Sequence, residues 1–150
     1  MDNAPKDVDS GGALTFGSGN IYAFRGDDKK DFWEYSINSD NWSDLDDAPK
    51  DVKEGGALVY LNGYVYALRG DRKKDFWRYS LASDSWVDLQ DAPDKVKKGG
   101  SLTTDGTAIY ALRGDGKKDF GGIASPTTSG RRFPTPLAGS EMAAVWRPTA

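Results

Sequence analysis

Three copies of the tripeptide Arg-Gly-Asp are the most prominent candidate for chemistry in this sequence of 150 residues. They lie at 25–27, 69–71 and 113–115, so equivalent positions are 44 residues apart. Arginine holds anions well because its planar guanidinium group donates paired hydrogen bonds to a carboxylate, sulfate or phosphate. If the fold arranges equivalent residues around one axis, three guanidinium groups could form a single anion site. The candidate ligand-binding residues are Arg25, Arg69 and Arg113.

Two other interpretations of the tripeptide are open. An exposed Arg-Gly-Asp loop is the kind of motif that integrins capture, so adhesion through this motif is a minor alternative function. A turn followed by a charge also explains all three copies, because each arginine has aspartates nearby in sequence, such as Asp31 and Asp75. Ion pairs at the protein surface contribute little to stability. Of these interpretations, the structural role for the triplet is favoured.

The sequence contains no histidine and no cysteine, which removes most common catalytic and metal-binding chemistry. Such a chain can form no Ser-His-Asp or Cys-His nucleophile, no thiolate or imidazole zinc site and no disulfide. Aspartate clusters such as 27–28 and 46–47 lack the ligand spacing of a calcium loop. No pair of unlike groups stands out as general acid and general base. We therefore predict a chain that is not an enzyme, with no catalytic residues, no metal and no cofactor.

The charge balance argues against nucleic-acid and membrane partners. The chain has 20 Lys and Arg against 23 Asp and Glu, a net charge of −3, and basic residues alternate with acidic ones. Such a chain lacks the positive field that holds phosphate backbones. Its apolar runs are far shorter than the roughly 20 residues that span a bilayer, and residues 1–5 do not resemble a signal peptide. We expect a soluble chain, and the sequence assigns no compartment to it.

Most of the chain is built from a repeat of 44 residues. The segment Ala-Pro-Lys-Asp-Val at 4–8 returns at 48–52 and, as Ala-Pro-Asp-Lys-Val, at 92–96. The first two units are identical at 28 of 44 positions, so their folds should be the same. We assign residues 1–120 to about two and a half units, namely 4–47, 48–91 and 92–120.

Each unit is predicted to form four short β-strands. In the second unit, 57–61 and 64–69 flank an Asn-Gly pair, the dipeptide that best tolerates the positive φ angles of a tight hairpin turn. A third strand at 75–81 and a fourth at 86–89 follow. The aromatic and β-branched content and the regular turn signals favour sheet over helix. The predicted fold class is all-β.

A four-stranded antiparallel unit with a period of about 40 to 50 residues is typical of a β-propeller blade. The order of features resembles the Kelch family: an apolar strand, a glycine-marked turn, a tyrosine in the third strand (Tyr35, Tyr79) and a tryptophan opening the fourth (Trp42, Trp86). Kelch blades usually carry two adjacent glycines after the second strand, where this chain has Arg-Gly. The resemblance implies Kelch-like propeller blades in an incomplete, open array.

The resemblance also implies a binding function. We expect a non-enzymatic fragment of a β-propeller whose parent binds a protein or a glycan, and aromatics such as Trp33 and Trp77 could either stack on sugars or pack between blades. The alternative is the propeller part of a carbohydrate-active enzyme whose catalytic residues lie outside this chain. The chain begins inside a connection between blades, so we expect further blades upstream. Because an open array exposes strands and blade faces, we also expect self-association through exposed blade edges.

Residues 121–150 depart from the repeat. Where the repeat calls for Trp-Arg-Tyr-Ser-Leu, the chain continues Gly-Gly-Ile-Ala-Ser, and a Pro, Gly, Ser and Thr-rich composition typical of irregular chain follows. Regrouping the codons by one base permits the missing residues. One match is forced, because the ATG codon of Met142 makes Ala143 regroup to glycine, 44 residues after Gly99. We predict an irregular tail that is a fourth repeat translated after the loss of one base near Phe120.

Overall fold

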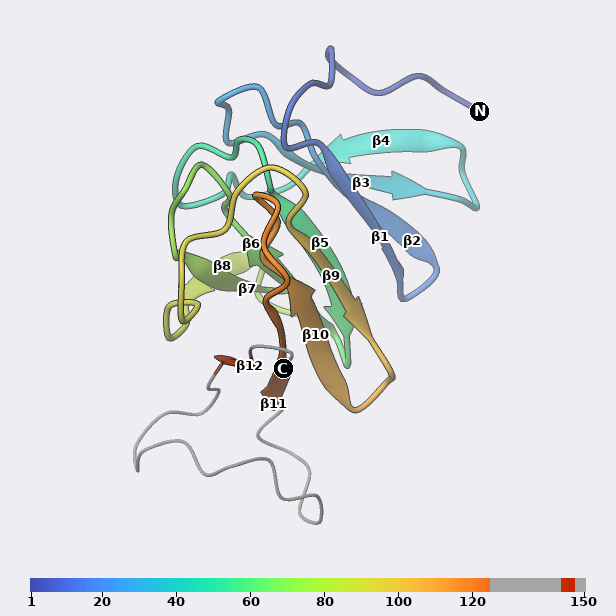
Figure 1. Ribbon diagram of the computed structural model, residues 1–150. Helices are drawn as coiled ribbons and strands as arrows, with labels where there is room; N and C mark the ends of the chain where they lie inside the picture. The colour runs from blue at the N-terminus through green and yellow to red at the C-terminus, as the bar shows by residue number, and fades with distance from the viewer. Residues whose placement is uncertain (125–143, 148–150) are drawn as a thin grey trace.

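The computed structural model describes residues 1–124 and 144–147, which form twelve β-strands and no helix (Figure 1). The strands make three antiparallel four-stranded sheets, each with its strands in chain order. The first sheet contains β1 (Ala13–Gly17), β2 (Asn20–Phe24), β3 (Phe32–Ser36) and β4 (Asn41–Asp44). The second contains β5 (Ala57–Leu61), β6 (Tyr64–Leu68), β7 (Phe76–Ser80) and β8 (Ser85–Asp88). The third contains β9 (Ser101–Thr104), β10 (Ala108–Leu112), β11 (Phe120–Ala124) and β12 (Ala144–Arg147).

This architecture confirms the predicted all-β fold of four-stranded antiparallel blades in an open array. The strands β1, β5 and β9 begin 44 residues apart, as do β2, β6 and β10. The predicted Asn-Gly hairpin is also confirmed, because Asn62 and Gly63 have φ angles of 51° and 84°. Two successive positive φ angles give a two-residue turn the twist that its flanking strands require.

The prediction of an irregular tail is wrong for the two strands that follow the third hairpin. β11 pairs with β10 in the register of the earlier repeats, with Leu112 opposite Phe120 as Leu68 is opposite Phe76. β12 then pairs with β11. Strand pairing uses backbone groups that nearly every residue carries, so the edge of β10 can accept a segment of a different sequence. The remaining residues of the predicted tail, 125–143 and 148–150, lie outside the described residues.

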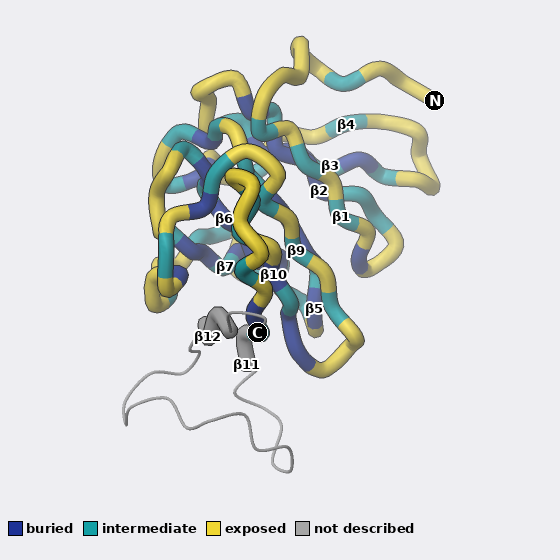
Figure 2. Tube along the Cα trace, in the orientation of Figure 1, coloured by how far each residue is buried: buried dark blue, intermediate teal, exposed yellow. Residues whose placement is uncertain are grey.

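The core lies between consecutive sheets and not within one sheet. Figure 2 shows the buried residues concentrated where the sheets face each other. Between the first and second sheets, Phe24 and Phe32 pack in one cluster with Trp77, Tyr79 and other buried residues of the second sheet. The same strand positions of the second sheet, Leu68 and Phe76, pack against the third. Each sheet therefore depends on its neighbour for burial, as expected for repeat architectures.

The innermost strands lie side by side, and the loops at one end of the sheets are bonded across the repeats. β5 contacts both β1 and β9. Lys29, in the loop after β2, forms a β-bridge with Val52 of the next repeat, and Lys73 does so with Val96. These bridges fix the loops that follow the first and second Arg-Gly-Asp triplets against the following repeat. All three repeats therefore contribute backbone to the same end of the array.

Candidate functional site

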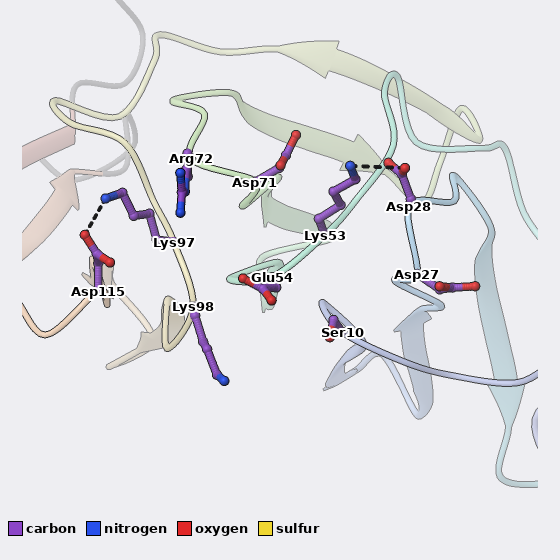
Figure 3. Close-up of a pocket in the computed structure, with 10 residues that line it drawn as sticks. All are labelled: Ser10, Asp27, Asp28, Lys53, Glu54, Asp71, Arg72, Lys97, Lys98 and Asp115. Atoms are coloured by element: carbon purple, nitrogen blue, oxygen red, sulfur yellow. Dashed lines mark hydrogen bonds and ion pairs between the residues drawn. The ribbon is translucent and has the colours of Figure 1, made fainter.

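An open cleft of about 290 Å³ lies at this end of the array, where the loops of the three repeats meet. Figure 3 shows side chains of the third repeat at one end of the cleft, those of the second in the middle and those of the first at the other end. The lining consists of nine charged residues and one serine: Ser10, Asp27, Asp28, Lys53, Glu54, Asp71, Arg72, Lys97, Lys98 and Asp115.

The first group of lining residues comes from a single variable position in an otherwise constant loop. The eight-residue segments 25–32, 69–76 and 113–120 are identical except at their fourth position. That position holds Asp28, Arg72 and Gly116, an acid, a base and a residue without a side chain. Asp28 and Arg72 both line the cleft. The invariant aspartate before this position, Asp27, Asp71 or Asp115, lines it in every repeat.

The second group comes from two adjacent variable positions between a valine and a Gly-Gly pair. The segments 8–12, 52–56 and 96–100 share this frame and differ only at their second and third residues. Those residues are Asp9 and Ser10, Lys53 and Glu54, and Lys97 and Lys98; all of them except Asp9 line the cleft. Within these two loop segments, every difference between the repeats therefore falls at a position in or beside the cleft.

Invariant glycines hold the two loop segments together. Gly70 has a φ of +73°, and a Cβ atom there would lie 2.4 Å from the carbonyl oxygen of Glu54. The next residue, Asp71, donates its backbone N–H to the same oxygen at 3.0 Å. Asp27 makes the equivalent bond to Ser10 at 3.0 Å, as does Asp115 to Lys98 at 2.9 Å. A constant backbone thus presents side chains of changing charge.

The charges in the cleft are partly paired. Lys53 Nζ lies 3.1 Å from Asp28 Oδ2, and this hydrogen bond raises the pKa of Lys53. Lys97 forms an ion pair with Asp115, and its hydrogen bond lowers the pKa of that carboxyl group. Glu54, in the middle of the cleft, has no ion-pair partner among residues 1–124 and 144–147, and the same holds for Arg72 and Lys98. These groups are available to a ligand.

The predicted anion ligands lie elsewhere. Arg69 Nε donates to the carbonyl oxygen of Asp51 at 2.9 Å and its Nη1 to Asp75 at 3.4 Å. Arg25 makes the equivalent bonds at 3.0 and 3.3 Å, and Arg113 at 3.0 and 2.8 Å. None of the three arginines lines the cleft, and each contacts its own repeat. A shared anion site at Arg25, Arg69 and Arg113 stays a prediction.

Each arginine is one part of a clamp within its repeat. Burial alone would raise the pKa of Asp75, but the hydrogen bond from Lys50 and the charges of Lys50 and Arg69 outweigh it and lower that pKa. Asp31 has its pKa lowered in the same way by Lys6 and Arg25, against the effect of burial. The triplet arginines therefore bind the Lys-Lys-Asp segment that follows them, which disfavours capture of the triplet as an adhesion motif.

Sequence reasoning missed the cleft because it searched for residues that the repeats share. The shared arginines and glycines form the frame, and the differing residues, such as Arg72 and Glu54, form the lining together with one shared aspartate from each repeat. A comparison of the repeats for their differences would have found them. No group of three or more Asp or Glu suitable for a metal ion occurs in the described part of the chain. The same part has no helix long and apolar enough to cross a membrane.

Comparisons with known proteins concern the fold. No protein-family model and no curated protein matches the chain. Among solved structures, that of YjhT matches with a TM-score of 0.65 at 15% sequence identity and covers 83% of this chain and 37% of that chain. At this identity the likeness shows the fold alone. The chain thus belongs, by fold, among β-propeller-like arrays, and it spans just over a third of YjhT.

Proposed function

We propose that this chain is a non-enzymatic binding module of the Kelch-like propeller type, and that the cleft binds a protein segment of mixed charge. One observation carries the proposal. Within the two loop segments that form the cleft, the repeats keep the frame and one invariant cleft aspartate each, and they differ only at the remaining positions in or beside the cleft. Differing side chains on a constant frame make three equivalent subsites unlike one another, as recognition of one asymmetric ligand requires.

The composition of the cleft favours a protein ligand over a glycan. Sugar recognition through stacking needs accessible aromatic rings, and the cleft lining contains none. The aromatics considered for this role, Trp33 and Trp77, are 0% exposed. Charged side chains instead complement charged side chains, which gives specificity and register more than raw affinity.

The order of charges suggests how such a segment would lie. Asp27 lines the first-repeat side of the cleft and Lys98 the third-repeat side, and neither has an ion-pair partner among the described residues (Figure 3). Asp28 and Lys97, in contrast, are paired with Lys53 and Asp115. A ligand with basic side chains toward the first repeat and acidic side chains toward the third would meet opposite charges along the cleft. Arg72, which has no ion-pair partner among the described residues, would add to the basic end.

A binding experiment with designed peptides tests this function. The probe is a synthetic peptide with a block of lysines followed by a block of glutamates, and its affinity is measured by calorimetry at low and high salt. We expect Arg72→Asp to weaken binding about tenfold, because it replaces attraction with repulsion at one subsite. Lys118→Asp is the matched control, because Lys118 is exposed and does not line the cleft.

The outcomes separate the alternatives. Equal loss in both variants would show a net-charge effect and contradict a role for the cleft. Binding of neutral oligosaccharides without binding of the block peptide would replace the protein ligand by a glycan. A purely basic or purely acidic peptide that binds as well as the block peptide would contradict the proposed order of charges.

We also propose that the chain from residue 121 onward is repeat sequence read in a shifted frame. Gly121 occupies the strand position of Trp33 and Trp77, and the regrouped codon at 121 is that of tryptophan if the Phe120 codon ends in T. A glycine at a position where both other repeats bury a large ring supports the proposal. The coding DNA tests it directly, because reading the other frame must give a continuous repeat through position 150.

A further inference from the structure

The three repeats bury the same apolar positions to different extents. Val52 and Val96 are 0% and 1% exposed, whereas the equivalent Val8 of the first repeat is 52% exposed. Leu58 is 5% exposed and its equivalent Leu14 is 67% exposed. The difference arises because the second and third sheets each have a preceding sheet against this side. We call the side of the first sheet that carries Val8 and Leu14 the leading face.

The third sheet shows the opposite imbalance. Phe24 and Phe32 are each 1% exposed because the second sheet covers them, whereas the equivalent Leu112 and Phe120 are 47% and 44% exposed. The ring of Phe120 stacks on that of Tyr110, with 5.9 Å between the ring centroids, so the exposed Phe120 ring is held in place by its own sheet. We call the side of the third sheet that carries Leu112 and Phe120 the trailing face.

The leading face contains an apolar cavity that side chains of the trailing face could fill. An open apolar cavity of about 480 Å³ is lined there by residues that include Val8, Leu14 and Trp42. The equivalent place on the second sheet is filled by the first sheet: the ring of Trp86 lies 5.8 Å from that of Phe24 and 4.9 Å from that of Phe32. The trailing face carries the equivalents of these two phenylalanines.

The backbone repeats this pattern. Lys29 bridges to Val52 and Lys73 bridges to Val96, each across an interface between repeats. The next members of the two series are Lys117, beside the trailing face, and Val8, on the leading face. Neither of them lies in a β-bridge within residues 1–124 and 144–147. The trailing face therefore carries the equivalents of the residues that contact the leading side of the next sheet at the two existing interfaces. This holds for the bridging backbone and for the aromatic side chains.

We propose that a second copy of this chain docks head to tail, with the leading face of one copy on the trailing face of the other. The contact continues the two interfaces already present between consecutive repeats. It is a heterologous contact of two different surfaces, and such contacts form a closed ring when the rotation between copies allows it. Two copies would cover all four faces and bring six sheets into one ring, within the four to eight blades of known propellers.

This docking would also extend the cleft of the proposed function, although it does not depend on that function. The cleft ends at Asp27 in the first repeat and at Asp115 in the third (Figure 3). Each docked interface would place a first repeat beside a third repeat. Residues of both copies would then line one continuous ring of subsites around the axis.

A pair of charge variants tests the contact on the full chain. Leu14→Glu alters the leading face and Leu112→Lys the trailing face; both residues are exposed, so the fold of one copy should be unchanged. We expect the unaltered chain to sediment at twice the mass of one chain, and each variant alone as a monomer because both of its interfaces carry a charge. Mixing the two variants should restore the dimer, because one interface is then unaltered and the other pairs Glu with Lys.

Val87→Glu is the matched control, because Val87 is also exposed but lies on the middle repeat, away from both faces. It should sediment like the unaltered chain. A monomer at every concentration would overturn the proposal and assign the two faces to another occupant. Growth of mass without limit, or a mixture of variants that stays monomeric, would also overturn it, since either result means that the two faces do not close on each other.

Discussion

Two tyrosine–aspartate pairs show how single residues tie a strand to the turn that follows it. Tyr35 donates a hydrogen bond to Asp40, and Tyr79 donates one to Asp84 at 2.5 Å. Both aspartates have positive φ angles, 53° and 46°, which residues other than glycine rarely adopt. The hydrogen bond to Asp40 raises the pKa of Tyr35 to about 12. Burial and then the hydrogen bond to Asp84 raise the pKa of Tyr79.

These pKa shifts predict a loss of stability in alkali. Above pH 10 the unfolded chain releases tyrosine protons that the folded chain retains, so the free energy of unfolding must fall as the pH rises. We expect Tyr79→Phe to cost roughly 1.5 to 3 kcal/mol at neutral pH, the value of a hydrogen bond to a charged group. The variant should also flatten the fall above pH 10. Urea unfolding at a series of pH values measures both effects.

Lys118→Met controls for general charge effects, because it removes an exposed titratable side chain that makes no hydrogen bond or ion pair within residues 1–124 and 144–147. A variant with the same alkaline slope as the unaltered chain would show that Tyr79 is not the group responsible. At this scale, the sequence predicted the tyrosines as parts of the repeat but not their partners. For Arg25 and Arg69 the sequence did offer the partners, since Asp31 and Asp75 were among the nearby aspartates; which of these aspartates a guanidinium group reaches depends on the path of the loop.

At the scale of elements, the array depends on the close contact between the loop after the second strand of each repeat and the turn at the Gly-Gly pair, as between Gly70 and Glu54. The close approach at Gly70, with its positive φ and its missing Cβ, is repeated at Gly26 and Gly114. Gly63 also has a positive φ, of +84°, but it lies in a hairpin turn with no atom within 4 Å of a Cβ placed there. A side chain at Gly63 would therefore meet backbone strain alone, whereas a side chain at Gly70 would meet both backbone strain and a steric clash.

We predict that Gly70→Ala destabilises the chain more than Gly63→Ala. The hairpin variant should cost about 1 to 2 kcal/mol, the strain of an L-residue in the left-handed region. The loop variant has the same strain and also a clash with the backbone of Glu54, which cannot rotate away, so its cost should exceed 4 kcal/mol, roughly the level that marks a severe defect. Thermal unfolding of both variants measures the difference. Equal costs would mean that the loop can move off the turn and that the cleft is not rigid.

The strands themselves were largely predictable because their signals are local. Apolar and aromatic residues with regular turn signals locate β5 and β6, and the Asn62–Gly63 pair locates the turn between them. β11 and β12 were not predictable in this way. Their place is decided by the free edge of β10, which is a partner from elsewhere in the chain, and glycines such as Gly121 carry no strand signal. Long-range pairing of backbone to backbone leaves little trace in composition.

At the scale of the whole molecule, stability is shared through the faces between sheets. The second sheet is covered on both sides, by Phe24 and Phe32 on one side and by Ile109 and Val96 on the other. Among the described residues, the first and third sheets each have one side that no other sheet covers. This arrangement links the two proposals, because a docked second copy would both complete the burial of the outer sheets and extend the charged cleft. We expect the third sheet, where Gly121 takes the strand position of Trp33 and Trp77, to be the weakest of the three.

Restoring the reading frame is the direct test of that weakness. Inserting a single T after the codon for Phe120 should place tryptophan at 121 and continue with Arg-Tyr-Ser-Leu, as the repeat requires. By equivalence with Trp77, the new indole would pack against the second sheet beside Leu68 and Phe76. Each large side chain that becomes buried contributes roughly 1.5 to 3 kcal/mol before the loss of chain entropy is subtracted. We expect the restored chain to unfold at higher urea and to resist protease longer, and Gly121→Trp alone to give part of this gain. A restored chain that is no more stable than the original would contradict the frame-shift proposal, because a correct strand must bury what the shifted one cannot.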